Sequence, residues 1–164
     1  MKDILQKLST YNIFNYLLPG IVFVSLLRYF TSYDLVIAEV LIGAFLYYFI
    51  GMIISRIGSL IIEPFLKKVK LIKFSNYKKF VAASKSDDKI ELFSEINNMY
   101  RTFLSMLIIL LTIVIQESAP KFFELSNTTK SIIGLLALIF LFLLSYRKQT
   151  EYINKRIDSQ SNEG

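Results

Sequence analysis

The sequence lacks both cysteine and histidine in all of its 164 residues. Without cysteine the chain has no disulfide framework, no thiolate metal site and no thiol nucleophile. Without histidine it lacks the commonest general base and the commonest metal ligand. Charged residues are also scarce, at 20%, whereas 54% of the residues are hydrophobic. These absences disfavour an enzyme, and we expect no catalytic site, no cofactor and no bound metal.

The hydrophobic residues are gathered in long runs, which is typical of membrane helices rather than of a soluble core. Four runs contain no charged residue, and they cover 9–27, 40–55, 102–116 and 131–146. A bilayer core of about 30 Å requires roughly 20 helical residues, so the shorter runs must extend past their polar flanks, the second one from Leu35. The first run is too long for a signal peptide and no small-residue cleavage site follows it. The sequence therefore predicts an all-α integral membrane protein with four transmembrane helices.

The cationic residues predict the orientation of these helices, because short loops rich in lysine and arginine stay on the cytoplasmic side. Of the 19 such residues, only Arg28, Lys121 and Lys130 lie in the two segments expected outside. Both termini and the long central segment are therefore expected in the cytoplasm. A bacterial inner membrane is the simplest setting.

These runs also predict how the chain is divided. Residues 1–66 hold the first transmembrane helix pair, 67–100 a basic amphipathic segment that forms a cytoplasmic helical hairpin, 101–148 the second helix pair, and 149–164 a cytoplasmic tail with a disordered end. Ser86 and the two aspartates after it are typical of a helix start. One helix of about 31 residues is expected to run from Ser86 into the third span.

The stretch "YNIFNYLLPG" at residues 11–20 interrupts the first apolar run with asparagines, a proline and a glycine. Pro19 has no N–H, so the carbonyl of Asn15 loses its helical partner, and Gly20 lowers the cost of a bend at this point. The kink serves either as a hinge or only as a packing device. A third possibility is that Met1 to Leu18 form an interfacial amphipathic helix, with Pro19 at the first position of the membrane span. We expect Asn12 and Asn15 to face water at the headgroups.

Small residues recur every four positions in the second predicted span, at Gly51, Ser55 and Ser59, with Gly43 two turns earlier. Small side chains at this spacing let helix backbones approach closely. This face is expected to be a helix contact, either within the chain or with a second copy. Gly58 and the Glu63-Pro64 pair are expected to end or bend the helix.

Two charged residues are expected at similar depth near the outer leaflet, Arg28 in the first span and Glu39 at the start of the second, where they could pair. No aspartate, glutamate, lysine or arginine occurs near the middle of any predicted span. Proton-coupled transport is therefore disfavoured.

The central segment is strongly basic, with lysines interleaved among apolar residues. Such a pattern indicates either contact with anionic lipid or a docking surface for an acidic partner. No motif supports sequence-specific nucleic-acid binding. The candidate contact residues are Lys67, Lys68, Lys70, Lys73, Lys78 and Lys79.

Four spans, a basic cytoplasmic hairpin, almost no soluble domain and the "NYLLPG" start of the first span resemble the small multi-pass membrane effectors encoded beside bacterial anti-phage systems, such as retron, CRISPR-ancillary and Kiwa loci. The resemblance implies a membrane effector that is held inactive, or cued, by a cytoplasmic protein or ribonucleoprotein partner. The leading hypothesis is a homo-oligomer that perturbs the inner membrane, as in abortive infection, when this partner signals. An alternative is a membrane anchor that forms no pore and recruits a soluble partner through residues 67–100. A membrane enzyme or carrier is the third class, which the missing histidines and midplane charges disfavour.

Overall fold

The computed structural model describes residues 10–87 and 89–118, together with Ile133, Leu136, Ile139, Phe140, Leu141 and Leu144. No strand occurs among them, so this part of the chain is all-α, as predicted. Three helices are long and apolar enough to cross a membrane, and they cover Thr10–Phe30, Val40–Lys68 and Lys89–Glu117. They correspond to three of the four predicted spans. The fourth, at 131–146, lies outside the described residues apart from isolated positions, as does the tail.

The first of these helices changes its winding just before Pro19. It contains the π-helical turn η1 (Ile13–Leu17) and then α2 (Leu18–Phe30), and the N–H of Leu18 bonds to the carbonyl of Ile13, five residues back. In an α-helix the proline ring would clash with the carbonyl of Asn15. The wider π turn relieves that clash. Because the helix runs without a break from Thr10, Pro19 does not start a separate span.

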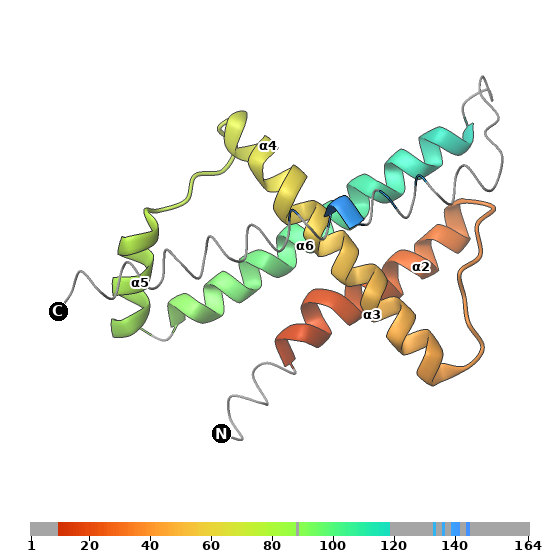
Figure 1. Cartoon of the computed structure of the whole chain (residues 1–164), viewed down its shortest axis with the longest axis horizontal. Coiled ribbons are helices and arrows are strands. Elements are labelled where there is room, and N and C mark those ends of the chain that lie inside the picture. The colour runs from red at the N-terminus through yellow and green to blue at the C-terminus, as the bar shows by residue number, and fades with distance from the viewer. Residues whose placement is uncertain are drawn as a thin grey trace. The chain divides into compact units, whose positions relative to one another are not determined.

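The second helix also contains a π-helical turn just before a proline. It consists of α3 (Val40–Ile57), the π-helical turn η2 (Gly58–Ile62) and α4 (Glu63–Lys68), which follow one another directly (Figure 1). The N–H of Glu63 bonds to the carbonyl of Gly58, and Pro64 follows at once. The helix begins at Val40 rather than at Leu35, and it passes Gly58 without ending.

The third helix is a single rod. A short helix, α5 (Tyr77–Ser86), precedes α6 (Lys89–Ser118), which at 30 residues is about 45 Å long. Ser86 belongs to α5. The carboxylate of Asp87 accepts the N–H of Lys89 at 2.9 Å, so Asp87 rather than Ser86 satisfies a free N–H at the start of α6.

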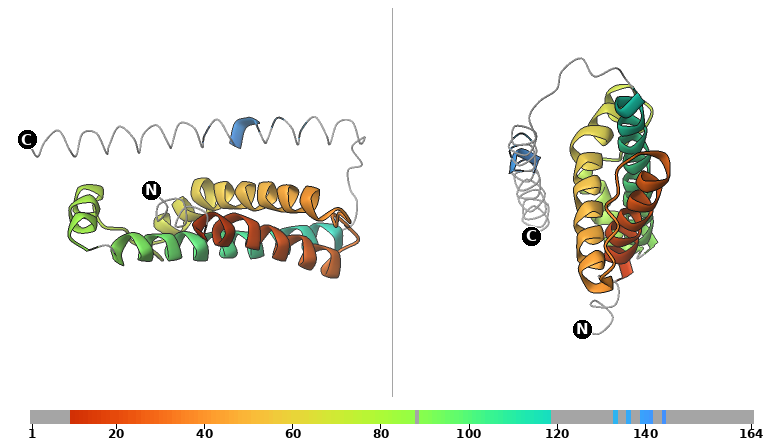
Figure 2. Two further views of the ribbon diagram at one scale, coloured as in Figure 1. Left: turned by 90° about the horizontal axis from the view of Figure 1, so that it is seen from below. Right: turned by 90° about the vertical axis from the view of Figure 1, so that its right-hand side faces the viewer.

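The described residues fall into two compact units, one ending at Glu63 and resuming at Glu95, the other covering Pro64–Ser94. The first unit contains α2, α3 and most of α6, which lie side by side in both views of Figure 2. Its apolar core takes side chains from all three helices, and on α2 and α6 the spacing of three or four residues places them on one helix face. The buried members are Phe23, Val24, Leu27, Ile54, Met106 and Leu110.

Candidate functional site

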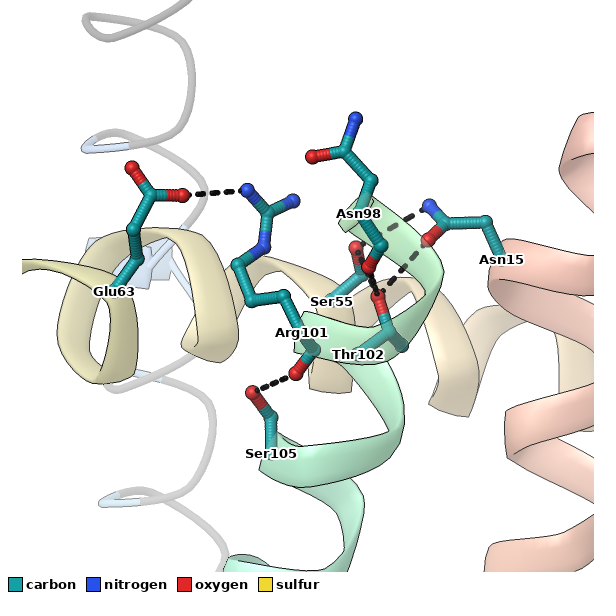
Figure 3. A network of polar contacts seen from close by, with 7 residues as sticks. All are labelled: Asn15, Ser55, Glu63, Asn98, Arg101, Thr102 and Ser105. Atoms are coloured by element: carbon teal, nitrogen blue, oxygen red, sulfur yellow. Dashed lines mark hydrogen bonds and ion pairs between the residues drawn. The ribbon is translucent and has the colours of Figure 1, made fainter. Parts of the chain in front are cut away.

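Three polar side chains from three different helices meet inside the first unit. Asn15 comes from η1, Ser55 from α3 and Thr102 from α6, and their exposed fractions are 1%, 2% and 0%. The Thr102 hydroxyl lies 2.9 Å from Asn15 Oδ1 and 3.2 Å from Ser55 Oγ, and Asn15 Nδ2 lies 3.4 Å from Ser55 Oγ (Figure 3). We call these three residues the polar ring.

The hydrogen atoms of the polar ring have one consistent arrangement. Each hydroxyl has a single proton to donate. If Thr102 donates to Asn15 Oδ1, Ser55 donates to Thr102, and the Asn15 amide donates to Ser55, the three groups close a cycle. Thr102 is also 2.9 Å from the carbonyl of Asn98. Donation to that carbonyl would leave Asn15 Oδ1 without a donor, so the closed cycle satisfies the buried groups better.

A largely buried ion pair lies beside the polar ring. Arg101 Nη1 donates to Glu63 Oε2 at 2.6 Å, and the side chains of Arg101 and Glu63 are 18% and 6% exposed. The buried Arg101 Nε has no hydrogen-bond partner among the described residues. The pair joins α6 to the residue that directly follows η2. Both π-helical turns thus adjoin buried polar contacts with α6.

Tyrosine rings surround the same end of the unit. The Tyr16 ring packs edge-on against those of Tyr11 and Tyr48, with centroids 6.2 and 5.5 Å away. Arg56 donates to the Tyr16 hydroxyl at 3.3 Å. Tyrosine and arginine commonly mark the boundary between the apolar and polar zones of membrane helices.

Glycines allow the helices to approach this closely. A Cβ on Gly51 would overlap the carbonyl of Tyr16, and a Cβ on Gly20 would overlap the carbonyl of Tyr47, so η1–α2 and α3 touch backbone to backbone at two points. Gly58 likewise faces the Ser105 hydroxyl of α6. Gly43 differs, because a Cβ there would meet its nearest neighbours only at 3.4 Å and beyond.

The residues that the sequence analysis singled out differ in burial. Asn15 is buried, so the expectation that it faces water was wrong, whereas Asn12 is half-buried. Ser55 belongs to the polar ring, and Ser59 is buried in η2. Pro19 and Gly20 are also buried. The six candidate lysines are all exposed, at Lys67, Lys68, Lys70, Lys73, Lys78 and Lys79.

At the opposite end of the unit, the expected pair of Arg28 and Glu39 does not form. Arg28 lies 3.5 Å from Asp34 rather than beside Glu39, and both side chains of this contact are more than half exposed. Asp34 lies in the loop between α2 and α3, which brings it back to Arg28. At the same end, Glu117 accepts the backbone N–H of Ser32 at 2.9 Å and also bonds its hydroxyl.

These contacts fix the register of α2 against α6. Asn15 meets Thr102 near one end, and Ser32 meets Glu117 near the other. At 1.5 Å per residue, the segments between these contacts are about 25 Å long on the side of α2 and about 22 Å long on α6, so they are similar in length. The two helices therefore run in parallel, with α3 antiparallel to both.

Sequence reasoning missed Thr102 and the Glu63–Arg101 pair. A signal for Thr102 was present, since it opens the third apolar run just as Ser55 closes the second. The sequence does not show which polar side chains lie side by side, because this depends on how far each helix is shifted along its axis relative to the others.

No protein-family model matches this chain, and no similar chain was found among curated proteins or solved structures. No group of metal-ligating side chains occurs in the described part of the chain. The hydrogen bonds of the polar ring join η1, α3 and α6, so what the ring can do is hold three apolar helices in one arrangement.

Replacing Thr102 by valine should lower the free energy of unfolding by about 1–2 kcal/mol, because the change keeps the shape but leaves Asn15 Oδ1 without its donor. Chemical unfolding in detergent micelles measures this. Thr112→Val is the matched control, since the exposed Thr112 hydroxyl bonds only to its own helix at Ile108. Equal losses for the two variants would contradict a structural role for the ring.

Proposed function

We propose that this chain is a non-enzymatic membrane effector of bacterial anti-phage defence, which oligomerises and perturbs the inner membrane when a cytoplasmic partner signals. The observation that carries the proposal is the polar ring, buried with the Glu63–Arg101 pair between apolar helices and beside two π-helical turns. The defence context comes from the resemblance in architecture. The effector mechanism is argued from the contacts themselves.

The energies of these contacts suit a switch. Side-chain hydrogen bonds between membrane helices contribute only about 0.6–2 kcal/mol each. The three hydrogen bonds of the polar ring together hold the helices in the closed arrangement. The binding free energy of a partner that prefers the open arrangement is large enough to exceed the sum of these bonds. The released side chains of Asn15, Ser55 and Thr102 would then line a water-accessible path or a contact between copies. π-Helical turns often occur at functional sites. Here η1 directly precedes α2, and η2 directly follows α3, so each turn adjoins a helix that would move when the ring opens.

A cue from the cytoplasm has a direct mechanical route to the ring. The helix Val40–Lys68 carries Ser55 and Glu63 and ends at the first two lysines of the basic segment. A force applied near Lys68 acts on the same continuous helix that holds the ring and the ion pair. This continuity favours a partner-gated effector over a permanently open pore.

The effector mechanism predicts that Pro19→Ala lowers activity without lowering abundance. The new N–H restores a helical partner for the Asn15 carbonyl, which favours an α-turn over η1 and rotates Asn15 by on the order of 100° away from Thr102. Membrane depolarisation after induced expression in a bacterium measures activity at matched protein levels. Ile21→Ala, at an exposed position of α2, is the control. Full depolarisation by Pro19→Ala would leave η1 as a packing detail.

The proposed topology has four spans with both termini in the cytoplasm. Reporter fusions after Ser84 and at the C-terminus should give a cytoplasmic signal, and a fusion after Leu125 should give an external one. The parallel register of α2 and α6 supports this up-down-up course of the first three helices. Termini in opposite compartments would require an odd number of spans and would exclude the proposed topology.

The second candidate is an anchor that recruits a soluble partner through residues 67–100 and forms no pore. The backbone contacts at Gly20 and Gly51 favour it, because such close packing makes a rigid bundle. Induced expression with no depolarisation under any cue, together with co-purification of a soluble protein, would select the anchor. A gene neighbourhood with a reverse transcriptase, a nuclease or a CRISPR component supports the defence context for both candidates.

A further inference from the structure

The segment that follows α4 exposes cationic and large apolar side chains together. Between residues 67 and 79, here named the lysine segment, there are six lysines and no acidic residue. All six lysines are exposed, and so are three of the apolar residues between them, with Leu71 at 72%, Val69 at 52% and Phe74 at 49%. Water alone is a poor environment for this apolar surface.

The chain holds one of these lysines in a strained position. The N–H of Leu71 bonds to the carbonyl of Leu66, and the N–H of Lys70 to that of Lys67, which is a Schellman end for α4. Lys70 occupies the left-handed position of this motif, with φ 61°, where glycine is the usual residue. A side chain at this position carries an energetic cost. A lysine here is explained most simply by a use for its charge.

The side chains indicate the kind of surface that the lysine segment meets. Interleaved lysines and aromatic or aliphatic residues are typical of segments that lie in the headgroup region of anionic membranes, with the apolar side chains inserted. A nucleic acid would engage the lysines but leave Leu71 exposed. Lys67 Nζ already lies 4.3 Å from the Phe74 ring centroid, so a cation and an aromatic ring face the surroundings together.

We propose that the lysine segment docks on the anionic phospholipid headgroups of the leaflet at which the helix Val40–Lys68 ends, with Leu71 and Phe74 inserted among the acyl chains. The helix Val40–Lys68 delivers the segment to that surface directly. This inference rests on the membrane-spanning part of the proposed function and is independent of any effector activity.

A fluorescent label at Leu71 tests the proposal in the intact protein. Because the chain has no cysteine, Leu71→Cys provides a single attachment site for NBD at an exposed position. The labelled protein is placed in nanodiscs of phosphatidylcholine alone or mixed with phosphatidylglycerol. The emission should shift to the blue only with phosphatidylglycerol, and 1 M salt should reverse the shift, since the Debye length falls to about 3 Å.

Charge variants separate electrostatic docking from simple insertion. Lys70→Gln should lower the ratio of docked to undocked protein about fivefold, the effect of removing one cation near an anionic surface. Lys70→Gly should lower it equally, although glycine relieves the strain of the left-handed position. The matched control is Lys89→Gln, at an exposed lysine outside the lysine segment, which should leave the ratio unchanged.

The possible results are distinguishable. Equal emission in both nanodiscs, or a shift that resists salt, would overturn the proposal and leave the lysine segment free for an acidic soluble partner. Equal weakening by Lys70→Gln and Lys89→Gln would also overturn it, because the response would then follow net charge alone. None of these readouts depends on depolarisation, so failure of the effector mechanism leaves this test intact.

Discussion

Replacing Arg101 by methionine should lower the free energy of unfolding by about 3–5 kcal/mol, the largest single effect we expect in this protein. The substitution removes the guanidinium that Glu63 Oε2 contacts at 2.6 Å, and only 6% of the Glu63 side chain is exposed, so water can replace this contact poorly. Chemical unfolding in detergent micelles, followed by circular dichroism, measures the loss. Arg28→Met is the matched control, since the Arg28–Asp34 contact is more than half exposed and such pairs contribute about 0–1 kcal/mol.

The double variant Glu63→Leu with Arg101→Met separates the value of the ion pair from the penalty of breaking it. Removing both charges should restore most of the lost stability, because a buried pair gains little over apolar side chains of similar volume. In the proposed effector, the same double variant should be stable but less responsive to a cue. Equally mild losses for Arg101→Met and Arg28→Met would contradict a stabilising role for the contact between Glu63 and Arg101.

Gly51→Ala should cost about 3 kcal/mol or more, the second largest effect. The added Cβ would overlap the carbonyl of Tyr16, and two backbones cannot separate there without disturbing the neighbouring polar ring. Alanine favours a helix over glycine by about 1 kcal/mol, so helix propensity would raise the stability. A net loss would therefore come from the overlap with the Tyr16 carbonyl. Unfolding in micelles and the yield of folded protein measure it.

Gly43→Ala on the same helix is the control for this prediction. A Cβ on Gly43 would make only ordinary contacts, with the Tyr47 ring and the Ile37 carbonyl, so alanine should be neutral or slightly stabilising. The two glycines share one helical stripe in the sequence, and only the structure separates them. Similar losses at both positions would show that the crossing of η1 and α3 is not where the structure has it.

The sequence by itself determined the class of this protein, because long uncharged runs permit few folds other than membrane-length helices. It also indicated that Gly51 and Ser55 share a face, since a spacing of four residues defines one side of a helix. The continuity of α6 through Tyr100 was predicted as well. The structure adds which face is buried: Thr102, Met106 and Leu110 lie inside, whereas Phe93, Tyr100 and Leu104 are exposed.

Only the tertiary structure decided which side chains meet. A local pattern shows that Asn15 is polar and that Pro19 disturbs the helix, but it contains no information on the level at which Thr102, 87 residues away, would cross it. Arg28 found Asp34 instead of Glu39 because the course of the loop, not depth alone, sets the partner. The sequence suggested that Asn15 faces water, and it assigned no partner to Glu63 or Arg101. Asn15 and Glu63 are buried because, once three apolar helices approach closely through glycine, polar groups at one level can satisfy each other.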